Sequence, residues 1–203
     1  MMKTAIVLSA TALLAGAASA QIRITEWCYQ GNSGEYIEIT NTGAAPVSLN
    51  TFSFDDNSRV PGSMMLSGIL APGASAIICD ILAADFRANW NIPASVLIIG
   101  GNTNNLSRGD EVNIYDGLNL IDRLTYDDQN LGGPRTQNFG GITQPANWGA
   151  NTVGTWFRAA VGDAYGSYAS AQGDVGSPGL VPTPGAAAAL GLGAVAGLRR
   201  RRR

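Results

Sequence analysis

Short runs in which apolar and polar residues alternate most strongly limit how this chain can fold. One run covers residues 22–25 and another residues 35–40, where Ile37 and Ile39 share one face. Alternate residues of a β-strand point to the same side of a sheet, so each run predicts a strand with one buried face. Gly, Pro, Asn and Asp interrupt these runs about every 8–12 residues, a spacing typical of a β-sandwich or barrel.

Later segments predict further elements of the same kind. Residues 111–115 and 120–126 flank Asp116-Gly117-Leu118-Asn119, a sequence that favours a tight hairpin turn. The run 96–99 is continuously apolar, so we expect a strand buried on both faces. One or two helical turns are expected over residues 81–89, with Asp80 as the N-cap.

Composition and charge exclude several functions. The chain has 203 residues, of which 45% are hydrophobic and 14% charged, which suits one packed domain. Residues 21–180 hold seven arginines and all fifteen acidic residues, a formal charge of 7 − 15 = −8. Because such a body repels phosphate backbones, we expect no nucleic-acid partner. The chain has no histidine, the commonest general base and metal ligand, and no phosphate-binding loop, so we expect no catalytic residues and no enzyme.

The N-terminal segment, residues 1–20, has the features of a secretory signal peptide. Lys3 precedes an apolar run, and Ala18-Ser19-Ala20 supplies the small residues that signal peptidase requires. We therefore expect cleavage between Ala20 and Gln21 and export of the remainder. The alternative is an N-terminal membrane anchor.

The C-terminal segment, residues 181–203, has three parts. Residues 185–198 are apolar, but 14 residues of helix span only about 21 Å, whereas a stable transmembrane helix needs roughly 20 residues. The arginines that follow favour a cytoplasmic C-terminus, so we expect a short transmembrane helix that anchors the chain transiently in the inner membrane. The cytoplasmic stop consists of Arg199, Arg200, Arg201, Arg202 and Arg203, and the segment before the helix is Val181, Pro182, Thr183 and Pro184.

This tail resembles the PEP-CTERM sorting signal of Gram-negative bacteria. That family has Val-Pro-Glu-Pro, a short apolar helix and a terminal arginine cluster, and here Thr183 stands in place of the glutamate. The resemblance implies recognition by an exosortase, a membrane cysteine protease that cleaves near the proline motif. It thereby implies delivery to the outer surface or the extracellular matrix.

The body, residues 21–180, resembles the lamin-tail domain in several motifs that occur in the family's order. The resemblance implies an all-β, immunoglobulin-like antiparallel β-sandwich. The chain departs from the family over residues 130–151, which are rich in Gly and Asn, and near residues 155–158, where the last strand is weakly marked. The matching segments are Ile24-Thr25-Glu26, Gly34-Glu35-Tyr36-Ile37-Glu38-Ile39-Thr40-Asn41, Pro46-Val47-Ser48-Leu49, residues 52–55, Leu70-Ala71-Pro72-Gly73, residues 106–116 and 120–126, and Gly176-Ser177-Pro178-Gly179.

Cysteines and carboxylates are the remaining candidates for chemistry. Cys28 and Cys79 are the only cysteines, and in an exported protein two cysteines favour one disulfide over two separate buried thiols. In a strand, Glu35 and Glu38 point to opposite faces, which is poor geometry for shared acid–base work, and the family resemblance implies that they bond nearby turns. Calcium is the metal that carboxylates would suit best, but no calcium-loop spacing occurs, so we expect no cofactor.

Two further groups have ordinary structural explanations. The adjacent pairs Asp55-Asp56 and Asp127-Asp128 are typical of turns. The aromatic residues suit either a carbohydrate-binding platform or core packing, of which packing is the commoner use. They are Trp27, Tyr29, Trp90, Trp148 and Trp156.

Together these features predict an exported cell-surface or extracellular-matrix protein that binds or structures extracellular material. The extracellular ligand is not indicated by any motif. The alternative is a small secreted, metal-dependent hydrolase built on the sandwich itself. A sandwich fold hosts many functions and does not by itself decide between the two.

Overall fold

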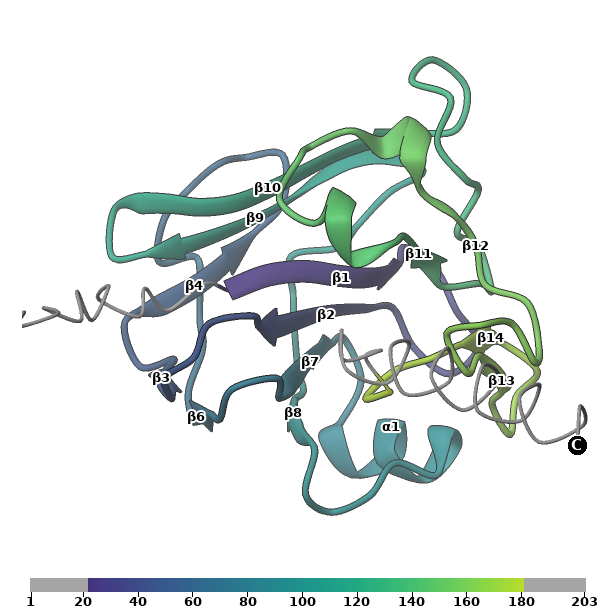
Figure 1. The fold of residues 1–203 in the computed structure, drawn as a ribbon, viewed down its shortest axis with the longest axis horizontal. Helices are drawn as coiled ribbons and strands as arrows, with labels where there is room; N and C mark the ends of the chain where they lie inside the picture. Colours follow the sequence, from purple (N-terminus) through teal and green to yellow (C-terminus); the bar gives the residue numbers. More distant parts are fainter. Residues whose placement is uncertain (1–21, 181–203) are drawn as a thin grey trace, which may run out of the picture.

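The computed structural model of the chain describes residues 22–180, which form two facing β-sheets (Figure 1). The larger sheet has the strand order β12 (Phe157–Arg158), β11 (Gly141–Ile142), β1 (Ile22–Cys28), β2 (Tyr36–Asn41), β7 (Ser75–Cys79) and β8 (Leu97–Ile99). The smaller has the order β10 (Asn119–Asp127), β9 (Gly109–Asp116), β4 (Phe52–Asp55) and β5 (Met64–Met65). The expected β-sandwich is therefore confirmed.

Smaller elements complete the fold. Strand β3 (Val47–Ser48) pairs with β6 (Ile69–Leu70), and β13 (Tyr168–Ala169) pairs with β14 (Val175–Gly176). One α-helix, α1 (Ala83–Trp90), and two 3-10 helices, η1 (Pro145–Asn147) and η2 (Val153–Thr155), lie in the connections. The weakly marked region near residues 155–158 forms β12, which pairs with β11 and completes the larger sheet.

The main core fills the space between the two sheets. Inward-pointing residues of the larger sheet, such as Ile24 and Ile37, meet those of the smaller sheet, such as Val112 and Leu124. A second cluster covers the outer face of the larger sheet, where Phe86 and other residues of α1 pack on β2 and β7. Strand β2 is consequently buried on both faces along its whole length.

Three local expectations differ from the structure. Strands β7 and β8 pair in parallel, so the larger sheet is not wholly antiparallel; the helix α1 lies in their connection, as a parallel crossover requires. The run 96–99 is only partly buried, because β8 is an edge strand. Helix α1 begins at Ala83 with Leu82 as N-cap and no side-chain cap, so Asp80 does not cap it.

The hairpin between β9 and β10 agrees with the sequence-based prediction. Asn119 pairs with Asp116, so Gly117 and Leu118 form a two-residue turn. Gly117 has a φ of 57°, a conformation that glycine adopts without strain.

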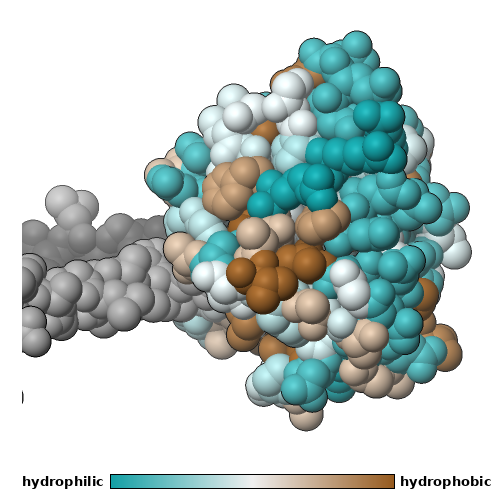
Figure 2. All heavy atoms as spheres, turned by 90° about the vertical axis from the view of Figure 1, so that its right-hand side faces the viewer, coloured by the Kyte–Doolittle hydropathy of each residue, from teal (hydrophilic) through white to brown (hydrophobic). Residues whose placement is uncertain are grey.

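The end of the sandwich that holds β12, β13 and β14 is shown from outside in Figure 2. Its surface is mostly hydrophilic, with a small group of apolar side chains near the centre. The predicted signal peptide (residues 1–20) and sorting segment (residues 181–203) lie outside the described residues. Between residues 22 and 180, no helix is long and apolar enough to cross a membrane.

Candidate functional site

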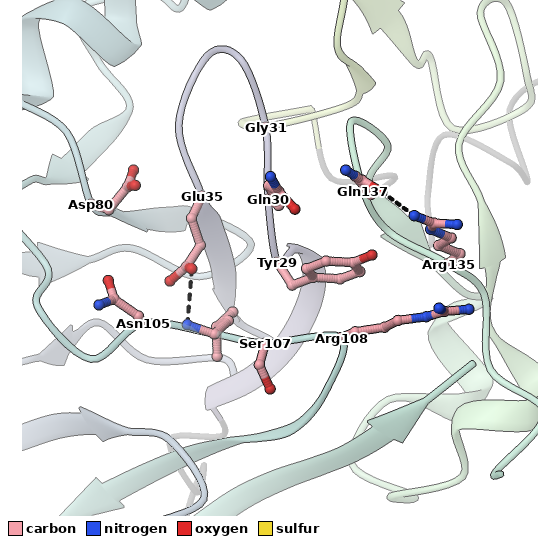
Figure 3. A pocket seen from close by; sticks show the side chains of 11 residues that line it. Tyr29, Gln30, Gly31, Glu35, Asp80, Asn105, Ser107, Arg108, Arg135 and Gln137 are labelled. Atoms are coloured by element: carbon pink, nitrogen blue, oxygen red, sulfur yellow. Dashed lines mark hydrogen bonds between the residues drawn. The ribbon is translucent and has the colours of Figure 1, made fainter. Parts of the chain in front are cut away.

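A polar pocket of about 470 Å³ opens where β1 ends, and it is the candidate binding site of this domain (Figure 3). Carboxylates lie on one side of Tyr29 and arginines on the other. The lining residues come from the segment after β1, the end of β7, the loop before β9 and the segment before β11. They are Tyr29, Gln30, Gly31, Glu35, Asp80, Asn105, Leu106, Ser107, Arg108, Arg135 and Gln137.

Glu35 holds the loop before β9 in place on the acidic side of the pocket. Its Oε2 accepts a hydrogen bond from the backbone N–H of Leu106 at 2.8 Å, and its Oε1 accepts one from Asn102 Nδ2 at 3.5 Å. Burial raises the pKa of Glu35 to about 8, and the nearby carboxylate of Asp80 adds to the shift. Glu35 is therefore largely protonated at neutral pH.

Asp80 lies beside Glu35, and its carboxylate accepts from backbone N–H groups, among them that of Glu35. Its Oδ1 is buried without a hydrogen-bond donor among the described residues. Burial raises the pKa of Asp80 as well. The acidic side of the pocket thus carries less negative charge at neutral pH than two carboxyl groups suggest.

The two arginines on the opposite side differ in their partners. Arg108 makes a bidentate ion pair with Asp128, with nitrogen–oxygen distances of 2.6 and 2.9 Å, which neutralises its charge. Arg135 donates from Nη2 to the side-chain oxygen of Gln137 and makes no salt bridge within residues 22–180. Arg135 is therefore the cationic group that remains for a ligand.

A second group of carboxylates lies on the outer face of the larger sheet. Glu26 and Glu38 are direct cross-strand neighbours and both are buried. Glu26 accepts hydrogen bonds from Tyr36 Oη at 2.5 Å and from the N–H and hydroxyl of Ser177 at 2.9 and 2.7 Å, and Glu38 accepts one from Gly179 N at 3.0 Å. These two carboxylates attach the C-terminal segment of the domain to the sheet.

A β-bulge explains why Glu26 reaches this outer face. The pairing of β1 with β2 shifts between Ile24 and Glu26, which leaves Thr25 as the extra residue. After the bulge, Glu26 points outward and Trp27 points into the main core. Regular alternation would place Glu26 on the same face as Ile24, among apolar residues.

Glu35 and Glu38 thus bond different turns from opposite faces of β2, in agreement with the structural role expected from sequence. Asp56 Oδ1 accepts from Ser58 N at 2.8 Å, and Asp127 Oδ1 accepts from Gln129 N at 2.7 Å, so these aspartates form turns as expected. No group of three or more Cys, Asp or Glu side chains between residues 22 and 180 is arranged to hold a metal ion.

The expected disulfide is not formed, because Cys28 and Cys79 are both free and buried. Cys28 pairs with Tyr36 on one side of β2, and Cys79 pairs with Tyr36 on the other. Two strands of a sheet that flank a third are separated by about 10 Å, whereas a disulfide needs Cα atoms closer than about 7 Å. The sheet register therefore keeps the two sulfur atoms apart.

We expect both thiols to resist alkylation in the folded protein. Burial raises the pKa of Cys28 and of Cys79 to about 12, so almost no reactive thiolate is present at pH 8. Mass spectrometry after iodoacetamide treatment without reductant should show no adduct on the native protein and two adducts in denaturant. A denatured, unreduced sample that takes up no label would contradict the assignment of free thiols.

Most of the aromatic residues considered for a carbohydrate platform lie in the cores. Trp27 packs against Tyr126 and Trp156 with ring centroids 5.2 and 4.9 Å apart, and Trp90 packs against Tyr36 in the outer cluster. Tyr29 is the member of that set that lines the large pocket.

Sequence reasoning missed Asp80, Arg108 and Arg135 as pocket residues. They lie far apart in the chain and meet only because segments that adjoin strands of both sheets line the same pocket. No spacing rule links such positions, so no sequence signal could have grouped them.

Comparison with known proteins gives one match. Residues 15–128, more than half of the chain, match the family described as Lamin Tail Domain. No curated protein and no solved structure matches the chain. The match covers β1 to β10, and the structure extends the same domain through β14.

Proposed function

The chain belongs to the lamin tail domain family, and on that premise we propose that it is an exported cell-surface or extracellular-matrix protein with a binding or structural role and no catalytic activity. The pocket beside Glu35 carries this proposal. Its lining offers hydrogen-bond donors and acceptors and one guanidinium, of Arg135, that makes no salt bridge within residues 22–180, which suits recognition of a polar ligand.

The position of the domain's end supports the export route. Gly179 is the last residue tied to the sheet by a described side-chain hydrogen bond, to Glu38. The sorting motif of residues 181–184 follows two residues later in the sequence, close to the end of the described domain. We propose that signal peptidase removes residues 1–20 and that an exosortase then processes the tail.

Replacement of the five terminal arginines by neutral residues tests this route. The apolar segment of residues 185–198 is too short to hold in the bilayer without the cytoplasmic charges, so we expect the variant to escape to the medium with its tail intact. The wild type should appear at the surface or outside, cleaved near residues 181–184 and without its arginines. Cell fractionation with intact-mass measurement distinguishes these products.

A charge-conserving variant with five lysines is the matched control and should be located and processed as the wild type is. A surface-located wild type that keeps its full tail would contradict exosortase processing and indicate a permanent anchor. Retention of the wild type in the cytoplasm would contradict the proposed function as a whole.

A further inference from the structure

We propose that the pocket beside Glu35 binds a carboxylate-bearing sugar unit of an extracellular polysaccharide, with Arg135 as the residue that pairs with the sugar carboxylate. This inference rests on the proposed surface function and gives its pocket a ligand class. It follows from three properties of the lining. One arginine makes no salt bridge, several polar side chains have no hydrogen-bond partner in the described fold, and Glu35 on the acidic side is largely protonated at neutral pH.

The lining arginine without a salt bridge within residues 22–180 is Arg135, whose charge nevertheless acts at longer range on the carboxylate of Asp128, which Arg108 already binds. The side chain of Arg135 is exposed, and its hydrogen bond to Gln137 is with a neutral group. Its Nε and Nη1 donate to no group among the described residues. A guanidinium presents parallel N–H donors that match the two oxygens of a carboxylate, which makes Arg135 the natural anchor for an acidic ligand.

The remaining polar lining matches hydroxyl groups. The side-chain amides of Gln30 and Asn105 and the hydroxyl of Tyr29 line the pocket and make no hydrogen bond within residues 22–180. Each amide offers a donor and an acceptor, as a sugar hydroxyl also does. Figure 3 shows Gln30 and Tyr29 between Glu35 and Arg135, with Asn105 on the carboxylate side of the pocket.

Protonation of Glu35 lowers the negative charge on the acidic side of the pocket at neutral pH. The pKa of Glu35 is about 8, and the groups that face it are the carboxylates of Asp80, Asp110 and Asp56, the N–H of Leu106 and the amide of Asn102. Ionisation of Glu35 above pH 8 adds a negative charge to the pocket. Binding of an acidic sugar should therefore weaken as the pH rises from 7 to 9.

The volume fits a small saccharide. A pocket of about 470 Å³ lies within the ordinary range for small-molecule sites, roughly 300–1,000 Å³. The net charge of −8 over residues 21–180 disfavours a large polyanion spread over the surface, so recognition has to be local to the arginine side of the pocket.

Isothermal titration calorimetry of the full chain tests the proposal. Trigalacturonic acid is the ligand, and its methyl ester is the matched ligand without charge. We expect binding of the acid at pH 7 and at least tenfold weaker binding of the ester. Arg135→Gln should weaken binding of the acid at least tenfold. Arg158→Gln should leave it unchanged, because Arg158 is also exposed but lies over the ring of Phe139 outside the pocket lining.

Asn105→Ala is the second variant, since Asn105 is exposed, lines the pocket and makes no side-chain hydrogen bond within residues 22–180. It should weaken binding several-fold at an unchanged midpoint of thermal unfolding. Absence of trigalacturonate binding, equal binding of acid and ester, or full binding by Arg135→Gln would each overturn the proposal. Because these results concern the pocket alone, a protein that is still sorted to the surface would leave the proposed function standing.

Discussion

Replacing Glu38 by Gln should stabilise the protein by about 2–4 kcal/mol at pH 8 and by less than about 1 kcal/mol at pH 5. Burial raises the pKa of Glu38 to about 8, and the adjacent carboxylate of Glu26 adds to the shift. Ionisation of both buried cross-strand carboxylates has a high free-energy cost, because neither has a cationic partner among the described residues.

The sign follows from proton binding. In the unfolded chain Glu38 ionises near its ordinary pKa, about 4.3, whereas the folded state keeps the proton to a higher pH. The folded state therefore binds more protons between these values, and stability falls as the pH rises through that window. Gln carries no charge at any pH and its amide oxygen can still accept from Gly179 N, so the variant should lack this loss.

Glu111→Gln is the matched control with the opposite expectation. Glu111 is also buried, but Arg59 binds both of its oxygens at 2.8 and 2.6 Å and lowers the pKa of Glu111 to about 2. Its loss should destabilise the protein by about 1–2 kcal/mol, equally at pH 5 and pH 8, because Glu111 is ionised at both. Urea unfolding of the three proteins at both pH values measures the effects, and a Glu38→Gln variant that is less stable than wild type at pH 8 would refute the argument.

Much of the sandwich follows from patterns that are local in the sequence. Alternation over residues 35–40 predicts β2, and Asp116-Gly117-Leu118-Asn119 predicts the hairpin turn, because side-chain direction and turn conformation depend on neighbouring residues alone. Features that depend on pairing between distant segments could not be predicted from the sequence. The β-bulge at Thr25 reverses the direction of Glu26, and nothing in Ile24-Thr25-Glu26 distinguishes a bulged from a regular strand.

The disulfide was predicted wrongly and the pocket was not predicted at all, for a related reason. A predicted export signal and a count of two cysteines favour a bond, but the sheet register decides whether Cys28 and Cys79 can reach one another. The pocket likewise depends on which loops the strand order brings together at one end of the sandwich. Pairing partners and register are properties of the whole sheet, which periodicity within one segment does not encode.

Strand β11 shows this limit most clearly, because its sequence has the composition of a loop. Gly140 and Gly141 lie in the Gly- and Asn-rich tract, yet Gly141 and Ile142 pair with β1 and β12. A Cβ on Gly141 would lie 2.5 to 2.7 Å from three ring atoms of Trp27. Glycine is thus required at this position by close approach to the indole ring, and the strand forms around that contact.

Gly141→Ala should therefore destabilise the protein by about 3 kcal/mol, a large value for the addition of one methyl group. The ring of Trp27 cannot move aside, because it is fully buried between Tyr126 and Trp156. Gly154→Ala is the control: the nearest atom to its added Cβ is the carbonyl oxygen of Leu131 at 4.0 Å, so its effect should stay within about 0.5 kcal/mol.

A double-mutant cycle separates the clash from a general loss of glycine. In a Trp27→Phe background the smaller ring leaves room for the methyl group, so the cost of Gly141→Ala should fall by at least half. Urea unfolding of the two single variants, the double variant and the wild type gives the coupling energy between the two positions. Additive effects would show that the glycine is needed for its backbone flexibility and not for the approach of β11 to Trp27. The close contact would then no longer explain why a strand forms in that tract.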